Sequence, residues 1–118
     1  MIASPAVAPP RLAHLFRGLA DPARLSCLLA VRDGPKTVGE IVQATGLSQP
    51  NVSKHLACLH GCGLVHAERT GRCVVYQLAS DDVERVIKAA EHLLRDVRPG
   101  DTPCPICGSR ALVPLVGT

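Results

Sequence analysis

The sequence predicts a mainly α fold with five helices and one β-hairpin, and three observations support this expectation. Apolar residues recur at helical spacing through most of residues 11–97. The spacing becomes strand-like only on either side of residues 70–72, whose Thr-Gly-Arg composition is typical of a hairpin turn. With 118 residues, 47% of them hydrophobic, the chain can form one small domain and is too apolar to be wholly disordered. We therefore expect a flexible Pro-rich arm (1–10), a folded domain (11–97) and a tail (98–118).

Capping residues predict where the helices begin. The expected starts, in chain order, are Arg11, the N-caps Asp21, Thr37 and Ser48, and finally Ser80. Thr37 is followed three residues later by Glu40, which is the pattern of a capping box. Gly46 is expected to end the third helix in a left-handed conformation, and Gly61 and Gly63 are expected to close the fourth.

Two short helices joined by a tight turn and followed by a hairpin predict a winged helix-turn-helix. Val42, Gly46 and Val52 have the spacing that this motif requires. The fourth helix would then turn polar side chains toward a DNA major groove, and the hairpin tip would add two cations for phosphates. The candidate DNA-contacting residues are Ser48, Gln49, Asn51, Ser53, Lys54, His55, Arg69 and Arg72. An ordinary solvated polar face is the alternative, and we favour DNA binding because turn, cap, apolar stripe and wing agree.

The charge of this unit predicts that it acts as a homodimer. Residues 36–77 hold four Lys and Arg against two Asp and Glu, a net charge of +2 that would bind duplex DNA weakly in a single copy. We therefore expect two copies on a palindromic operator. The helices of residues 11–19 and 80–97 carry apolar stripes outside the DNA-binding unit, and we assign them to the homodimer interface.

Four of the six cysteines suggest a metal site. The chain shows no secretory signal and no apolar run near the ~20 residues of a membrane helix, so we expect a cytoplasmic protein with reduced thiols and no membrane association. Cys58 and Cys62 lie four residues apart beside the apolar stripe of the fourth helix, with their Cβ atoms ~5–6 Å apart. Cys104 and Cys107 form a second pair in the polar tail. Thiolate ligands favour soft ions such as Cd²⁺, Pb²⁺, Cu⁺, Zn²⁺ or trivalent arsenic.

Other interpretations of these cysteines stay open. Cys58 and Cys62 could be small hydrophobic residues beside the core, or a redox switch, and the tail pair could hold a structural zinc in a protein-interaction module. Cys27 is expected in the core, whereas Cys73, on a strand, has no assigned role. We expect no enzyme, because the sequence shows no paired carboxylates, no Ser–His–Asp set and no phosphate-binding Gly-rich loop.

The chain resembles the ArsR/SmtB family of metal-sensing repressors over about residues 11–97. Three segments carry the resemblance: 19–25 (LADPARL), 48–56 (SQPNVSKHL) and 63–65 (GLV) before the wing. The resemblance implies a dimeric winged-helix protein that occupies a palindromic operator and leaves it when a metal binds. It also implies control of its own promoter and of a resistance or efflux gene.

Within the family, residues 51–65 are similar to the CmtR-type cadmium/lead sensors. This similarity implies Cd²⁺ or Pb²⁺ as the inducer, with Zn²⁺, As(III) and Sb(III) as alternatives. It also implies that Cys58, Cys62 and Cys104, which follows Pro103, are metal ligands. Cys107 is an addition to the pattern, so the coordination number and the subunit that supplies the tail thiolate stay open.

Overall fold

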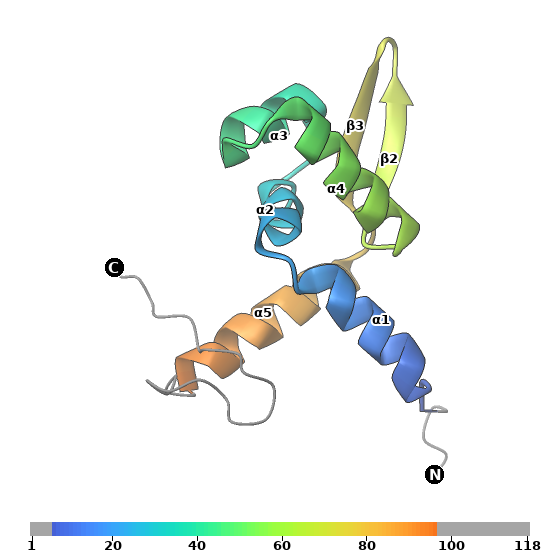
Figure 1. Cartoon of the computed structure of the whole chain (residues 1–118), viewed down its shortest axis with the longest axis vertical. Helices are drawn as coiled ribbons and strands as arrows, with labels where there is room; N and C mark the ends of the chain where they lie inside the picture. Colours follow the sequence, from blue (N-terminus) through green and yellow to red (C-terminus); the bar gives the residue numbers. More distant parts are fainter. Residues whose placement is uncertain (1–5, 97–118) are drawn as a thin grey trace. The chain divides into compact units, whose positions relative to one another are not determined.

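The computed structural model describes residues 6–96. Its elements, in chain order, are α1 (Pro9–Leu19), α2 (Pro22–Ala30), β1 (Lys36–Thr37), α3 (Val38–Thr45), α4 (Gln49–Gly61), β2 (Val65–Thr70), β3 (Cys73–Leu78) and α5 (Asp81–Asp96) (Figure 1). The chain divides into two units, Met1–Glu84 and Arg85–Thr118, with the boundary inside α5. The expected mainly α fold with five helices and a wing is confirmed in this part of the chain.

Three helices begin at the capping residues that the sequence predicts. Asp21, Thr37 and Ser48 each accept a hydrogen bond from the backbone N–H three residues later, at 2.8, 3.2 and 3.3 Å. At α3 the Glu40 carboxylate accepts in return from the Thr37 N–H at 2.9 Å, which completes the capping box. These bonds satisfy backbone N–H groups that the first turn of a helix leaves without a partner, and they fix the start of each helix.

The first and last helices have slightly different ends from those expected. Helix α1 begins at Pro9 rather than at Arg11, because a proline at the first positions of a helix lacks only an N–H that would have no helical partner. Helix α5 ends at Asp96, and Val97, the expected last residue, lies outside the described residues. At the start of α5, Glu84 forms an ion pair with Arg32 at 2.7 Å.

The wing is part of a three-stranded antiparallel sheet with the order β1-β3-β2. Strands β2 and β3 pair from Val65 opposite Leu78 to Thr70 opposite Cys73, so the hairpin lies where the sequence predicts it. The sequence analysis missed β1, which pairs with β3 and places Lys36 opposite Tyr76. A two-residue strand is too short to show alternation, and its second residue is also the N-cap of α3.

The core of the first unit packs α4 against α2, α3 and the base of the hairpin. Its buried apolar residues are Cys27, Leu28, Val31, Ile41, Val52, Leu56, Leu59, Leu64, Val65 and Val83. The expected stripe of α4 is fully enclosed, and the expectation that Cys27 is a core residue is confirmed. This burial fixes which face of α4 remains for other partners.

The turn between α3 and α4 has the left-handed geometry that its glycine predicts. Gly46 has φ = 75°, and its N–H donates to the Val42 carbonyl at 2.8 Å. A side chain at this φ is strained even though no heavy atom lies within 4 Å of the position that a Cβ would occupy. The turn therefore places α4 through backbone conformation and not through side-chain packing of Gly46.

Two glycine substitutions test this reason. Gly46→Ala is expected to lower the free energy of unfolding by about 1 kcal/mol, because alanine resists the left-handed conformation. Gly39→Ala, inside α3 and with its nearest neighbouring atom at 3.9 Å, is expected to raise it by about 0.5–1 kcal/mol. Urea unfolding of both variants at one protein concentration measures the two changes. Destabilisation of equal size in both would contradict the conformational explanation.

Candidate DNA-binding surface and thiol site

Helix α4 presents its polar residues on the side opposite the core. Val52 and Leu56 have no exposed surface, whereas the candidate side chains between and before them point away from the interior. Ser48, Gln49, Asn51, Ser53 and Lys54 are exposed, and His55 is half-buried. The Ser48 hydroxyl accepts from the Asn51 N–H as the helix cap, and its own hydrogen stays available to a phosphate oxygen. The polar face predicted from the sequence is therefore continuous along the first turns of α4.

The hairpin carries the two other candidate cations away from the core. Arg69 lies near the end of β2, Arg72 lies in the turn, and both are exposed. Gly71, with φ = 63°, makes the tight turn between the strands. In Figure 1 the base of the hairpin lies beside the last turn of α4, and its tip extends away from that turn. This arrangement provides two separate basic positions, one on the helix at Lys54 and one on the wing.

The second candidate site is at the other end of α4. Cys58 lies in the last turn, and Cys62 is the C-cap residue, whose N–H donates to the Cys58 carbonyl at 2.9 Å. Both thiols are free and half-buried, which agrees with their expected position at the border of the core. Burial raises the pKa of Cys62, and the negative charge and hydrogen bond of the Cys58 side chain raise it further. The i, i+4 spacing and the backbone bond between the two residues place their side chains one turn apart on the same side of the helix end.

Arg24 joins α2 to α1 beside these thiols. Its guanidinium donates from Nε to the Gly18 carbonyl at 2.7 Å and from Nη2 to the Arg17 carbonyl at 2.8 Å. These bonds satisfy carbonyls at the C-terminal end of α1. The same positive charge acts on Cys62 and opposes the rise of its pKa. The sequence analysis did not assign Arg24 a role, although it lies in the conspicuous segment 19–25.

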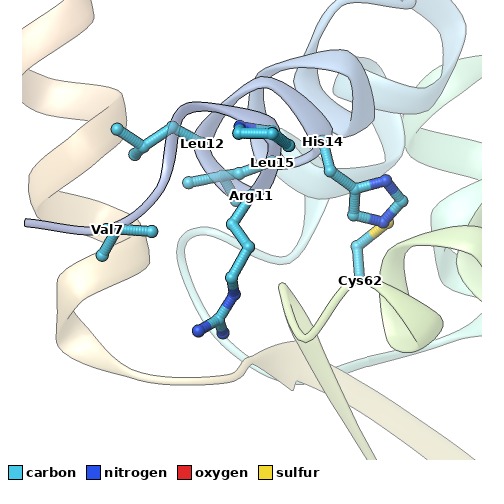
Figure 2. A pocket seen from close by; sticks show the side chains of 7 residues that line it. Val7, Arg11, Leu12, His14, Leu15 and Cys62 are labelled. Carbon is cyan, nitrogen blue, oxygen red and sulfur yellow. The ribbon is translucent and has the colours of Figure 1, made fainter.

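Helix α1 contacts Cys62 at two positions one turn apart. The His14 Nε2 atom lies 3.9 Å from the Cys62 Sγ atom, and Figure 2 shows the imidazole ring directed at this sulfur. At Gly18, an added Cβ would lie 3.4 Å from the same sulfur, so the backbone of α1 passes directly over it. His14 also borders a cavity of about 450 Å³ with mostly apolar walls, which include Leu12 and Leu15. The sequence did not predict that His14 lies beside Cys62. The one hint it contained is that His14 and Gly18 are four residues apart and therefore lie on the same face of α1.

The structure brings together only part of the predicted metal site. Cys104 and Cys107 lie outside the described residues. Within residues 6–96, no three His, Cys, Asp or Glu side chains are already grouped as a metal site. Cys73 is exposed at the start of β3, and Cys27 is buried with a raised pKa, caused first by burial and then by Asp21. Among the cysteines of residues 6–96, Cys58 and Cys62 are thus the pair that is placed to bind one soft ion together.

Comparison with known proteins identifies the class of this chain. A family model described as "Bacterial regulatory protein, arsR family" matches residues 21–67. The HTH-type transcriptional regulator CmtR of Mycobacterium bovis is 44% identical over 100 residues, which cover 85% of this chain and 82% of that protein. The Streptomyces lividans protein named "Probable mercury resistance operon repressor" is 40% identical over 92 residues, 78% of this chain and 74% of that protein.

A solved structure agrees with the fold. The solution structure of a homodimeric winged helix-turn-helix DNA-binding domain from Mycobacterium bovis has a TM-score of 0.69 and 30% identity, and covers 74% of this chain and 81% of that one. Fold and relatives together define a DNA-binding transcriptional regulator of the winged helix-turn-helix class, not an enzyme. The chain belongs to the ArsR family. None of the helices within residues 6–96 has the length and apolar character needed to cross a lipid bilayer.

The interaction between the two thiols can be measured directly. In Cys58→Ser, the pKa of Cys62 is expected to fall, because the neighbouring thiolate and its hydrogen bond no longer favour the protonated form, while burial keeps it above the ordinary value. Alkylation of Cys62 by iodoacetamide should then reach half its maximal rate at a lower pH, since only the thiolate reacts. Mass spectrometry of the modified peptide follows the rate. Cys73→Ser is the control and should leave the profile unchanged.

Proposed function

We propose that the protein is a metal-responsive repressor that binds a palindromic operator as a homodimer and leaves it when Cys58 and Cys62 capture a soft ion. Cd²⁺ or Pb²⁺ is the inducer, and a tail thiolate from Cys104 or Cys107 completes the site. The regulated genes are its own promoter and a resistance or efflux gene. The observation that carries the proposal is the pair of free, half-buried thiols one turn apart at the end of the helix that reads DNA.

The donor set fits a soft ion. Two thiols one turn apart can bind one cation from the same side of the helix, and neither is sealed inside the core. Aspartate and glutamate, which harder ions require, do not join Cys58 and Cys62 in any metal-binding group within residues 6–96. The relative named as a probable mercury resistance operon repressor supports regulation by a thiophilic metal.

The contacts of Cys62 suggest how metal capture reaches the DNA-binding geometry. Cys62 lies against α1 at Gly18, and Arg24 holds the same end of α1 to α2. A shift of Cys62 toward its ligand partners would therefore displace α1. If α1 lies in the dimer interface, the spacing of the two α4 helices changes with it. A coupling of only ~1–3 kcal/mol between the two sites would reduce operator affinity 5–150-fold.

Exposed apolar side chains support the homodimer. On α1, Leu12 is 42% and Phe16 55% exposed, and these two residues lie one turn apart on one face. On α5, Leu93 is 61% and Leu94 67% exposed. Large apolar side chains gathered on one helix face are costly in water and are typical of an interface. The homodimeric state of the related Mycobacterium bovis domain agrees with this assignment.

The first experiment measures release of DNA by metal. Cd²⁺ or Pb²⁺ added to the reduced protein on its operator is expected to lower affinity within the 5–150-fold range, as read by fluorescence anisotropy of the DNA. Cys58→Ser and Cys62→Ser should abolish the response. Cys73→Ser, which changes an exposed thiol outside the site, should keep the full ratio of affinities.

The outcomes distinguish the alternatives. Release by arsenite or antimonite, and not by Cd²⁺ or Pb²⁺, would assign the same thiols to a different inducer. Release by oxidant together with a disulfide, and without a sulfur-to-metal absorption band, would make the thiols a redox switch. An operator affinity that no ion and no oxidant changes would rule out sensing at these thiols.

The second experiment separates phosphate contacts from base contacts. Arg72→Ala is expected to weaken binding to all duplexes alike and to reduce the slope of log affinity against log salt by about 1, because one phosphate contact is lost. Asn51→Ala should instead reduce the difference in binding free energy between the operator and a mutated operator. The expected reduction is about 1–3 kcal/mol, because the Asn51 side chain would lose its contact with one base edge. Arg17→Ala, an exposed cation on α1, is the control. Equal salt slopes for the Arg72 and Arg17 variants would contradict the role of the wing.

A further inference from the structure

A side chain of another helix, the imidazole of His14, lies next to Cys62, and a site built from sulfur atoms alone would not use it. The His14 Nε2 atom lies 3.9 Å from Cys62 Sγ, and its ring is directed at the sulfur (Figure 2). We propose that His14 is a metal ligand, so that α1 and α4 together form a site with two sulfur donors and one nitrogen donor for a divalent cation such as Cd²⁺ or Zn²⁺. This inference rests on the proposed function and adds a ligand that the cysteine pattern does not contain.

The observed distance is close to that of two ligands on one ion. With a metal–sulfur bond of ~2.3 Å and a metal–nitrogen bond of ~2.0–2.1 Å, tetrahedral geometry separates sulfur and nitrogen by about 3.6 Å. The observed separation of 3.9 Å is slightly longer and would suit an ion larger than zinc. A hydrogen bond between His14 and Cys62 would also explain this contact. It would not explain why a second thiol, that of Cys58, lies one turn away on the same helix.

Cys62 is the shared member of two donor pairs. It lies one turn from Cys58 on α4 and 3.9 Å from His14 on α1, although the three side chains do not yet form a closed group within the described residues. Closing the group requires a rotation of His14. Its side chain is exposed and borders a cavity of about 450 Å³, so it has room to rotate.

Charge and protons balance for a divalent ion. Cys58 and Cys62 each release one proton on binding, and His14 binds as neutral imidazole through Nε2 with its hydrogen on Nδ1. Two thiolates then neutralise the two positive charges of the cation, and a third thiolate from the tail would leave the complex with one negative charge. No oxidation or reduction takes part.

Coordination by His14 would make the site selective among metal ions and would connect α1 directly to the end of α4. Imidazole is a good ligand for Zn²⁺ and Cd²⁺, whereas an ion that accepts only sulfur gains nothing from it. His14 lies on the face of α1 that includes Gly18, four residues later. Coordination by His14 would thus join α1 to the end of α4 through the ion. Ions that His14 binds would move α1 more strongly than ions held by sulfur alone.

The test compares His14→Gln with a matched control in the full-length, reduced protein. His60→Gln changes another exposed histidine on α4, between the two cysteines in sequence. Cd²⁺ affinity is measured by competition with a chelator, and X-ray absorption spectroscopy reports imidazole bound to the ion. Circular dichroism checks that each variant folds, which is expected because both side chains are exposed.

The expected result is an imidazole signal in wild type and His60→Gln and its loss in His14→Gln. Loss of His14 should weaken Cd²⁺ binding about tenfold or more, since residues that merely orient a ligand already contribute 10–100-fold. Arsenite, which binds through sulfur, should bind all three proteins alike. Equal Cd²⁺ affinity and no imidazole signal in wild type would overturn the inference while leaving the proposed function intact. Absence of any sulfur-to-cadmium band in wild type would instead overturn both.

Discussion

The burial of the apolar stripe of α4 is the constraint on which the rest of the structure depends. Val52, Leu56 and Leu59 are fully enclosed by α2, α3 and the base of the hairpin, so the rotation of α4 about its axis is fixed. That rotation turns the polar residues at the start of the helix outward. It also places Cys58 and Cys62 at the border of the core, where a thiol is protected from bulk water and still reachable by a ligand.

In the function proposed above, one helix would serve two chemistries at its two ends. Its first turns expose short hydrogen-bonding side chains and Lys54, which suit a nucleic-acid surface. Its last turn and C-cap hold the two cysteines, and Cys62 contacts α1. Because the helix between the two ends is rigid and packed in the core, a force applied at Cys62 is not absorbed locally. Sensing and DNA reading can be linked without a long chain of intermediate residues.

Much of this fold could be predicted from the sequence because local signals and tertiary structure agree. Asp21, Thr37 and Ser48 cap their helices by side-chain bonds that depend only on nearby residues. Gly46 adopts the left-handed conformation that a glycine at the end of a helix predicts. Strand β1 could not be predicted in this way, because its pairing with β3 joins residues about forty positions apart and leaves no pattern in two residues.

The candidate site also contains one part that local sequence spacing predicts and one part that depends on tertiary packing. The spacing of Cys58 and Cys62 on one helix predicts their proximity, since four residues make about one turn. The positions of His14 and Arg24 beside them depend on how α1 and α2 pack against the end of α4, and helical periodicity contains no information on that packing. Residues that surround a site from other helices are therefore the ones that sequence reasoning misses, although they set its charge and its donors.

Gly18 shows what this packing demands of the chain. A methyl group there would just touch the sulfur of Cys62, and any larger side chain would have to displace either the thiol or the whole of α1. If His14 and Cys62 bind one ion as proposed, the size of residue 18, which has no donor atom of its own, would set the gap across which α1 and α4 share it. Evolution could retune such a sensor by altering that gap, without exchanging a single ligand.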